Sequence, residues 1–266
     1  MGHSQSPWLF TQTKDKGLAW EHPFAGLPLE LISQLMTGDG DDPAGDAGIQ
    51  GYFNHFHQWE GPLAEGAAAG WNLAGVTGTT TIVHGDVRNG SIIITPDGTA
   101  NADPCLQLGS SSAGACFRYS AGKQLWVFAR LKVDSVAAIE MFFGLGTPDT
   151  QPTVTNTFPS DGIFFEKALT ATDLDFHVRQ DGTSTEKTSV TGATLTDDTY
   201  FTIGFKVDVD GNIMPYYNGT ALLTKVVAAS DTNIPDGATD ILQLMIASLG
   251  ASRLTTLDWV LAMQEL

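Results

Sequence analysis

The stretch Tyr200–Thr220 constrains the fold of this chain more than any other part of the sequence. Its first half alternates apolar residues with polar or small ones, which is the period of a strand with one buried face; the apolar positions are Phe201, Ile203, Phe205 and Val207. Asp210-Gly211 then supplies the dipeptide of a tight hairpin, and Asn218-Gly219 offers a second turn into Ala221–Val227. The stretch predicts a β-meander and indicates no chemistry by itself.

From Trp71 onward, most of the sequence is also typical of β-structure. Short runs of β-branched and aromatic residues are separated by Gly, Asp and Asn turns; these runs are Thr79–Val83, Ser91–Thr95, Cys105–Leu108, Ala115–Tyr119, Leu125–Val133, Ala138–Leu145, Gly162–Glu166, Asp175–Gln180, Glu186–Val190, Ile241–Ser248 and Leu257–Leu266. We expect Cys105–Leu108 and Ala115–Tyr119 to form a hairpin. About twelve to fourteen strands with almost no helix predict an all-β sandwich or barrel over residues 71–266.

Residues 1–70 have a different character, and we refer to them as the arm. Prolines interrupt the arm repeatedly, only Leu27–Met36 has a helical pattern, and residues 37–48 form a Gly/Asp-rich stretch expected to be a loop. The arm also carries aromatic residues that are rarely left in water, namely Trp8, Phe10, Trp20, Phe24, Phe53, Phe56 and Trp59. We expect them either to pack on the chain's own domain as a lid or to dock on another subunit.

Charge restricts the classes of partner. The formal net charge is -17, so direct binding to a nucleic acid backbone is not expected. A soluble surface is the simplest explanation of this charge. No window approaches the roughly 20 apolar residues of a membrane span, and no basic-then-apolar leader follows Met1, so we expect synthesis in a cytoplasm.

Candidate metal and cysteine sites are weak. His55-Phe56-His57 with Glu60 could offer metal ligands, but three close ligands are more typical of exposed or interface side chains. Asp208-Val-Asp210-Gly211 resembles the start of a calcium loop without its later ligands, and a hairpin explains it better. We expect Cys105 and Cys116 to be buried free thiols and not a disulfide, because a cytoplasm is a reducing compartment. We therefore predict no metal site and no cofactor, and leave a structural calcium ion open.

Enzymatic motifs are also missing. A glycosidase needs two carboxylates facing each other, about 5 to 9.5 Å apart, and on a strand these usually appear as alternating acids. Here the strand acids stand singly, at Glu140, Glu166, Asp173, Asp175 and Glu186. Ser110, Ser111 and Ser112 do not form a nucleophile elbow, and there is no phosphate loop or dinucleotide fingerprint. The sequence favours a protein that is not an enzyme.

Several stretches together carry a family resemblance. They are WNLAGVTGTTTIVHGDVRNGSIIIT, LWVFARLKVDSVAAIEMFFGLG, YFTIGFKVDVDGNIMPYYNGTALL and LDWVLAMQEL. Over residues 71–266 this order of strands and turns resembles the concanavalin A-like jelly rolls of tailed-phage virions. Lectin and glycosidase domains share the same order.

The resemblance implies a structural protein on the capsid surface of a virion, assembled in the host cytoplasm. Its expected role is capsid decoration, with the arm binding the major capsid protein and neighbouring copies in a homo-oligomer. A tail or head-fibre position is the structural alternative. A lectin-like module is the binding alternative, for which Trp126, His177, Tyr200 and Tyr216 are the candidate glycan contacts; a glycosidase or polysaccharide lyase is expected less.

Overall fold

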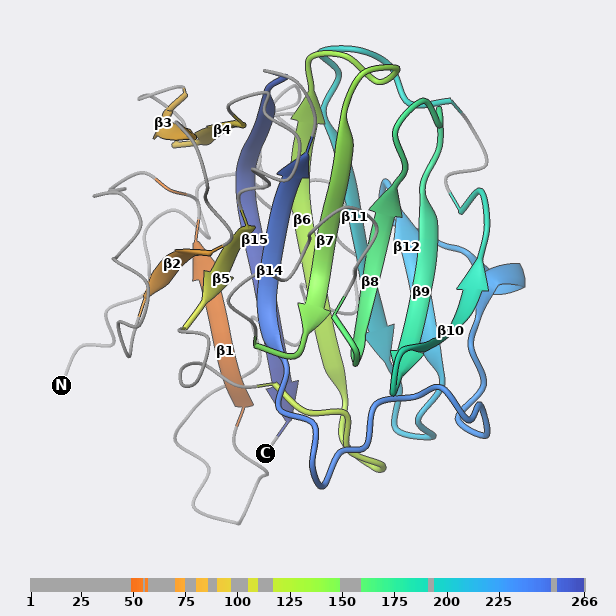
Figure 1. Ribbon diagram of the computed structural model, residues 1–266. Helices are drawn as coiled ribbons and strands as arrows, with labels where there is room; N and C mark the ends of the chain where they lie inside the picture. The colour runs from red at the N-terminus through yellow and green to blue at the C-terminus, as the bar shows by residue number, and fades with distance from the viewer. Residues whose placement is uncertain are drawn as a thin grey trace, which may run out of the picture.

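The computed structural model shows two antiparallel sheets packed face to face (Figure 1). It describes residues 49–54, 56, 70–74, 80–85, 90–96, 105–109, 117–148, 159–190, 194–249 and 253–265. Within these ranges the chain forms strands, turns and one short 3-10 helix, η1 (Leu223–Lys225), and no α-helix. The predicted all-β sandwich is confirmed. The described part of the chain contains no helix with the length and apolar character of a membrane span.

Sheet A contains eight strands and includes the C-terminal strand. Its order is β13 (Thr220–Ala221), β12 (Ile213–Tyr217), β11 (Phe201–Val207), β6 (Leu125–Val133), β15 (Thr255–Glu265), β4 (Ile92–Thr95) and β3 (Thr81–His84), and β1 (Ile49–Asn54) also pairs with β15. The predicted meander therefore occupies one side of this sheet as β11, β12 and β13. Only its third strand is shorter than expected, because η1 follows Ala221 and Val227 keeps a single bridge to Ile213.

Sheet B contains seven strands. Its order is β10 (Thr183–Lys187), β9 (Asp175–Gln180), β8 (Gly162–Lys167), β7 (Glu140–Gly146), β14 (Gln243–Leu249), β5 (Cys105–Leu108) and β2 (Trp71–Ala74). The hairpin expected between Cys105–Leu108 and Ala115–Tyr119 is wrong for the described residues. β5 pairs with β14 and β2, and Phe117 bridges to Leu242 instead. A short apolar run does not specify its partner strand, so contacts between residues far apart in the sequence determine the pairing of β5.

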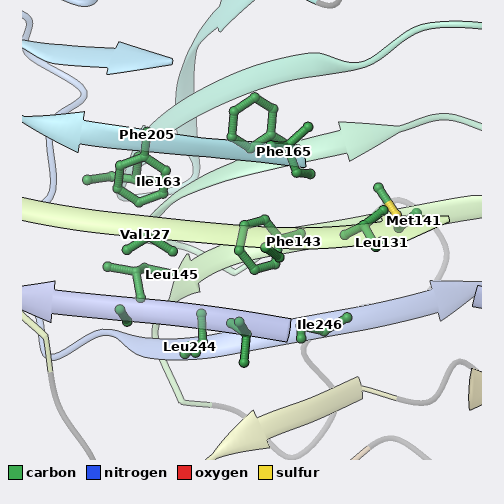
Figure 2. Close-up of a cluster of buried hydrophobic side chains, with 14 of the residues drawn as sticks. Val127, Leu131, Met141, Phe143, Leu145, Ile163, Phe165, Phe205, Leu244 and Ile246 are labelled. Atoms are coloured by element: carbon green, nitrogen blue, oxygen red, sulfur yellow. The ribbon is translucent and has the colours of Figure 1, made fainter. Parts of the chain in front are cut away.

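The main core lies between the two sheets. Side chains at alternate positions of each strand meet there, as Figure 2 shows for Val127 and Leu131 of β6 and Phe143 and Leu145 of β7. Both sheets therefore bury one face against the other, in the way that antiparallel sandwiches do. We call the opposite face of each sheet its outer face.

The N-terminal boundary of the sandwich lies earlier than expected. Strand β1 falls inside the predicted arm, yet all six of its residues pair with β15. The hydroxyl of Tyr52 accepts hydrogen bonds from Trp71 Nε1 at 2.7 Å and Asn54 Nδ2 at 2.9 Å, and burial raises the pKa of this phenol. Phe56 is 1% exposed and packs near Trp71 in the main core. The sandwich therefore begins by residue 49 rather than 71.

Candidate functional site

The outer face of sheet B carries the group of titratable side chains with the most defined geometry. Glu166 of β8 lies opposite Asp175 of β9, and His177 of β9 lies opposite Glu186 of the edge strand β10. All four side chains lie on one face, because strand residues two apart point the same way. We call these four residues the sheet B polar group.

Glu166 and His177 form the centre of this group. His177 Nε2 lies 3.0 Å from Glu166 Oε2, and the contact becomes an ion pair when the imidazole is protonated. Their side chains are only 8% and 12% exposed, and the imidazole stacks on the Phe164 ring with centroids 5.1 Å apart. A shielded imidazole and carboxylate at this distance can hold or pass a proton.

The opposed carboxylates of Glu166 and Asp175 were not visible as a pair in the sequence. They lie nine positions apart in the sequence, and only the register of β8 with β9 brings them together. Asp175 Oδ1 accepts a hydrogen bond of 2.7 Å from the Ser189 backbone N–H. Both acids therefore contact groups of their own chain, Glu166 through the His177 imidazole and Asp175 through the Ser189 backbone N–H.

Beside this group, the outer face of sheet B is apolar and buried. The apolar side chains form one cluster, which consists of Cys105, Phe142, Phe164, Met245 and Ala247. Gln107 of β5, the strand next to the edge strand β2, is fully buried and has no hydrogen-bond partner for either amide atom among the described residues. Cys116, the possible partner of Cys105 in a disulfide, lies outside the described residues.

The structure distributes the expected glycan contacts over both sides of the sandwich. Trp126 and Tyr216 lie on the outer face of sheet A and are buried there, whereas His177 lies on the outer face of sheet B. Tyr200 precedes β11, where the Arg130 guanidinium lies 4.2 Å from its ring centroid. The four residues do not form one platform.

The expected contacts of the arm are only partly described. Phe56 is buried in the core of its own chain, so its ring is not at the surface for a partner. Phe53 belongs to β1, at the register position opposite Leu261. The other residues lie outside the described ranges; these are Trp8, Phe10, Trp20, Phe24 and Trp59.

The acidic hairpin at Asp208–Asn212 is a turn, as expected. The Asp208 carboxylate accepts hydrogen bonds from the backbone N–H groups of Asp210 and Asn212 and from Asn212 Nδ2. Gly211 has a φ of 84°, which favours glycine. Within the described ranges, no three histidine, cysteine or acidic side chains come together closely enough to hold a metal ion.

A second apolar cluster on the outer face of sheet A is a feature that we did not expect from the sequence. It contains Trp126, Phe128, Tyr216, Trp259, Leu261 and Met263, with Met214 and Ala221 packed against it. The signal was present in the β6 sequence LWVFARLKV, where Trp126 and Phe128 interrupt the polar phase of the alternation. A strand that is apolar in both phases is typical of burial on both faces.

Comparison with known proteins finds similarity in the fold and none in the sequence. No known protein family and no curated protein matches the sequence. A protein of unknown function from Shewanella oneidensis MR-1 is 13% identical with a TM-score of 0.54, over 90% of this chain and 94% of that one. Peanut lectin is 12% identical with a TM-score of 0.51, over 82% and 98% of the two chains.

An endo-β-1,3-glucanase from Pyrococcus furiosus is similar to the same degree. It is 13% identical with a TM-score of 0.51, over 80% of this chain and 93% of that one. At such low identity these likenesses report the path of the backbone and not a shared activity. The chain has a concanavalin A-like jelly-roll fold, of the kind found in lectins and glucanases.

Proposed function

We propose that this chain is a non-enzymatic structural protein of a tailed-phage virion, of the capsid decoration type. Its partners would be the major capsid protein and neighbouring copies of itself. The resemblance of its strand order to phage jelly rolls supports this role. So does the aromatic-rich segment before β1, because such segments bind large surfaces and gain avidity from repeated lattice positions.

The non-enzymatic part of the proposal rests on the buried apolar side chains that occupy the outer faces of both sheets. On sheet A the face holds buried aromatic side chains, and on sheet B it holds a buried Phe, Met and Cys cluster. A hydrolase of this fold class would need an open face with two available carboxylates. Among the described residues, the one opposed pair, Glu166 and Asp175, is already in contact with His177 and Ser189.

The test is particle binding by the purified protein. Removing residues 1–26 takes away Trp8, Phe10, Trp20 and Phe24 and leaves β1 and the sandwich intact. We expect the full chain to co-sediment with particles that lack it, and the shortened chain to stay in the supernatant. Mass spectrometry of purified virions should find many copies per particle. Absence of the protein from virions would refute the proposal.

Carbohydrate binding is the second candidate function, and the sheet B polar group favours it. Glu186 is exposed and His177 and Asp175 lie beside it, so hydroxyl donors and acceptors of a glycan would find partners on this edge. A glycan array should then show binding that His177→Ala abolishes and Tyr216→Phe, on the other sheet, preserves. Binding to no glycan at millimolar concentration would exclude this function.

A further inference from the structure

Strand β10 forms an open edge of sheet B. It is the last strand in the order of this sheet, and among the described strands only β9 pairs with it (Figure 1). Thr183, Ser184 and Glu186 are exposed in the single chain. The exposed edge of a strand presents backbone N–H and C=O groups on which another strand can pair.

The hairpin between β9 and β10 determines which backbone groups face outward. Its loop is Asp181-Gly182, with φ values of 49° and 78° that are typical of a type I′ turn. The flanking residues Gln180 and Thr183 are therefore hydrogen-bonded to each other, and bonded and non-bonded pairs alternate from there along the hairpin. It follows that the N–H and C=O groups of Ser184 and Glu186 point away from β9.

The open part of this edge ends after Lys187. The carbonyl oxygen of Thr188 also points outward by the same alternation, but Lys225 Nζ donates a hydrogen bond of 2.6 Å to it. Within β10, Ser184 and Glu186 are thus the residues that offer both a donor and an acceptor to an added strand.

This pattern is complementary to itself about a two-fold axis. When two copies of β10 pair antiparallel about Thr185, Ser184 of one copy lies opposite Glu186 of the other, and these residues exchange both backbone hydrogen bonds. A register centred on Glu186 would instead use the Thr188 carbonyl oxygen that Lys225 already contacts, and it would place two Glu186 carboxylates directly opposite each other.

On the outer face, the register about Thr185 brings opposite charges together. Arg179 of β9 lies opposite Ser184, so it is two strand spacings, about 10 Å, from Glu186 of the second copy. Arg179 Nε is buried without an acceptor among the described residues, and the two long side chains can together span this distance. The two Glu186 carboxylates lie diagonal to each other, and one Arg179 beside each offsets their repulsion.

On the inner face, an acid and a cation also meet. The Thr185 hydroxyl donates a hydrogen bond of 2.8 Å to Asp231. Lys187 of the second copy would lie opposite Thr183 and diagonal to Thr185, within reach of this carboxylate. The two Asp231 side chains approach the two-fold axis, and each has one Lys187 of the other copy beside it.

We propose that β10 is an interface between two copies of this chain, which pair antiparallel about Thr185 and join their B sheets into one continuous sheet. The contact is short, so it belongs to the weak class of interfaces that gain from repetition. This inference goes beyond the proposed function and does not depend on it, because the free chain carries the whole edge.

Disulfide trapping in the full-length protein tests the register. Thr185→Cys places two thiols at a directly opposite, non-hydrogen-bonded pair with Cα atoms about 4.5 Å apart, which a disulfide can bridge. Ser184→Cys is the matched control, because its two copies are diagonal and about 7–8 Å apart. We expect mild oxidation to give a covalent dimer of the first variant, and none of the second variant or of the unaltered chain. No dimer from Thr185→Cys, or as much dimer from Ser184→Cys, overturns the proposal.

Sedimentation equilibrium tests the pairing without added cysteines. The two chains each carry a net charge of -17, so the measurement uses physiological ionic strength, at which repulsion beyond about 8 Å is screened. The unaltered chain should associate to a dimer as its concentration rises. Ser184→Pro removes an outward N–H and leaves the bonds to β9 in place, so it should raise the dissociation constant about tenfold or more. Ser184→Ala keeps the N–H and should associate like the unaltered chain. A chain that stays monomeric, or a dimer that Ser184→Pro does not weaken, overturns the proposal.

Discussion

The outer faces of the two sheets are both apolar at their centres, but the charged residues at their borders are partnered differently. On sheet A, Arg130 pairs with Asp258 and Lys132 pairs with Asp198. On sheet B, the central contact is that of Glu166 with the His177 imidazole. The aromatic cluster of sheet A is therefore bordered by cations with acidic partners, whereas the cluster of sheet B is bordered by a shielded imidazole–carboxylate contact.

The largest effect that we predict concerns the buried aromatic cluster on the outer face of sheet A. Trp259→Ala should lower the free energy of unfolding by about 3–5 kcal/mol, as truncation of a buried aromatic does in a core. Urea denaturation measures this loss. Trp259→Phe is the matched control and should cost about 1 kcal/mol, because it keeps an aromatic ring and the indole N–H has no described acceptor.

The second prediction tests how Phe128 packs on sheet A. Gly204 lies opposite Phe128 in the register, and a Cβ at residue 204 would collide with the Phe128 ring and the Val127 carbonyl oxygen. Gly204→Ala should therefore cost about 2–3 kcal/mol in urea denaturation. In a double-mutant cycle with Phe128→Ala the combined loss should be smaller than the sum of the single losses. Strict additivity would show that the ring is not the obstacle.

The inner face of β6 could be predicted from the sequence, and the pairing of several strands could not. Leu125, Val127 and Leu131 point to the core as the alternation indicated. By contrast, Cys105 pairs across to Ala247, a partner far away in the sequence that local residues do not encode. Glu166 and His177 were read as separate strand residues for the same reason, since only the register of β8 with β9 brings them together.

The boundary of the arm could not be predicted because β1 has a weak strand pattern. Its sequence IQGYFN includes a glycine and no sustained alternation. The pairing with β15 and the hydrogen bonds of Tyr52 stabilise this strand from outside the segment itself. Tertiary contacts thus override a poor local propensity.

The third prediction contrasts the cations of the two sheets. Those of sheet A point outward, whereas Lys167 of sheet B is fully buried and donates to the carbonyl oxygens of Ile139 at 2.7 Å and Ala168 at 3.1 Å. Burial lowers the pKa of Lys167 to about 8, and the nearby charges of Glu140 and Asp173 oppose this shift. Lys167 therefore releases its proton at a lower pH in the folded chain than in the unfolded chain.

The sign of the resulting pH dependence follows directly. Between about pH 8 and pH 10.5 the unfolded chain binds more protons at this lysine, so stability should rise with pH, by about 1 kcal/mol from pH 8 to pH 9. Urea midpoints at the two values measure the rise. Lys167→Met should remove this contribution and Lys187→Met, on the edge of the same sheet, should preserve it. An identical pH profile in all three proteins would contradict the assignment to Lys167.

The smallest predicted effect concerns the border of sheet B. Glu166→Ala removes the contact with His177 and should cost about 1 kcal/mol, because the pair is shielded from solvent yet carries little net energy once desolvation is counted. Glu186→Ala, which removes an exposed acid opposite the same histidine, should change stability by less than about 0.5 kcal/mol. If His177 is held by Glu166 specifically, its imidazole NMR signals should shift in the first variant far more than in the second. Equal shifts of the His177 signals in both variants would mean that Glu166 makes no specific contact with the imidazole.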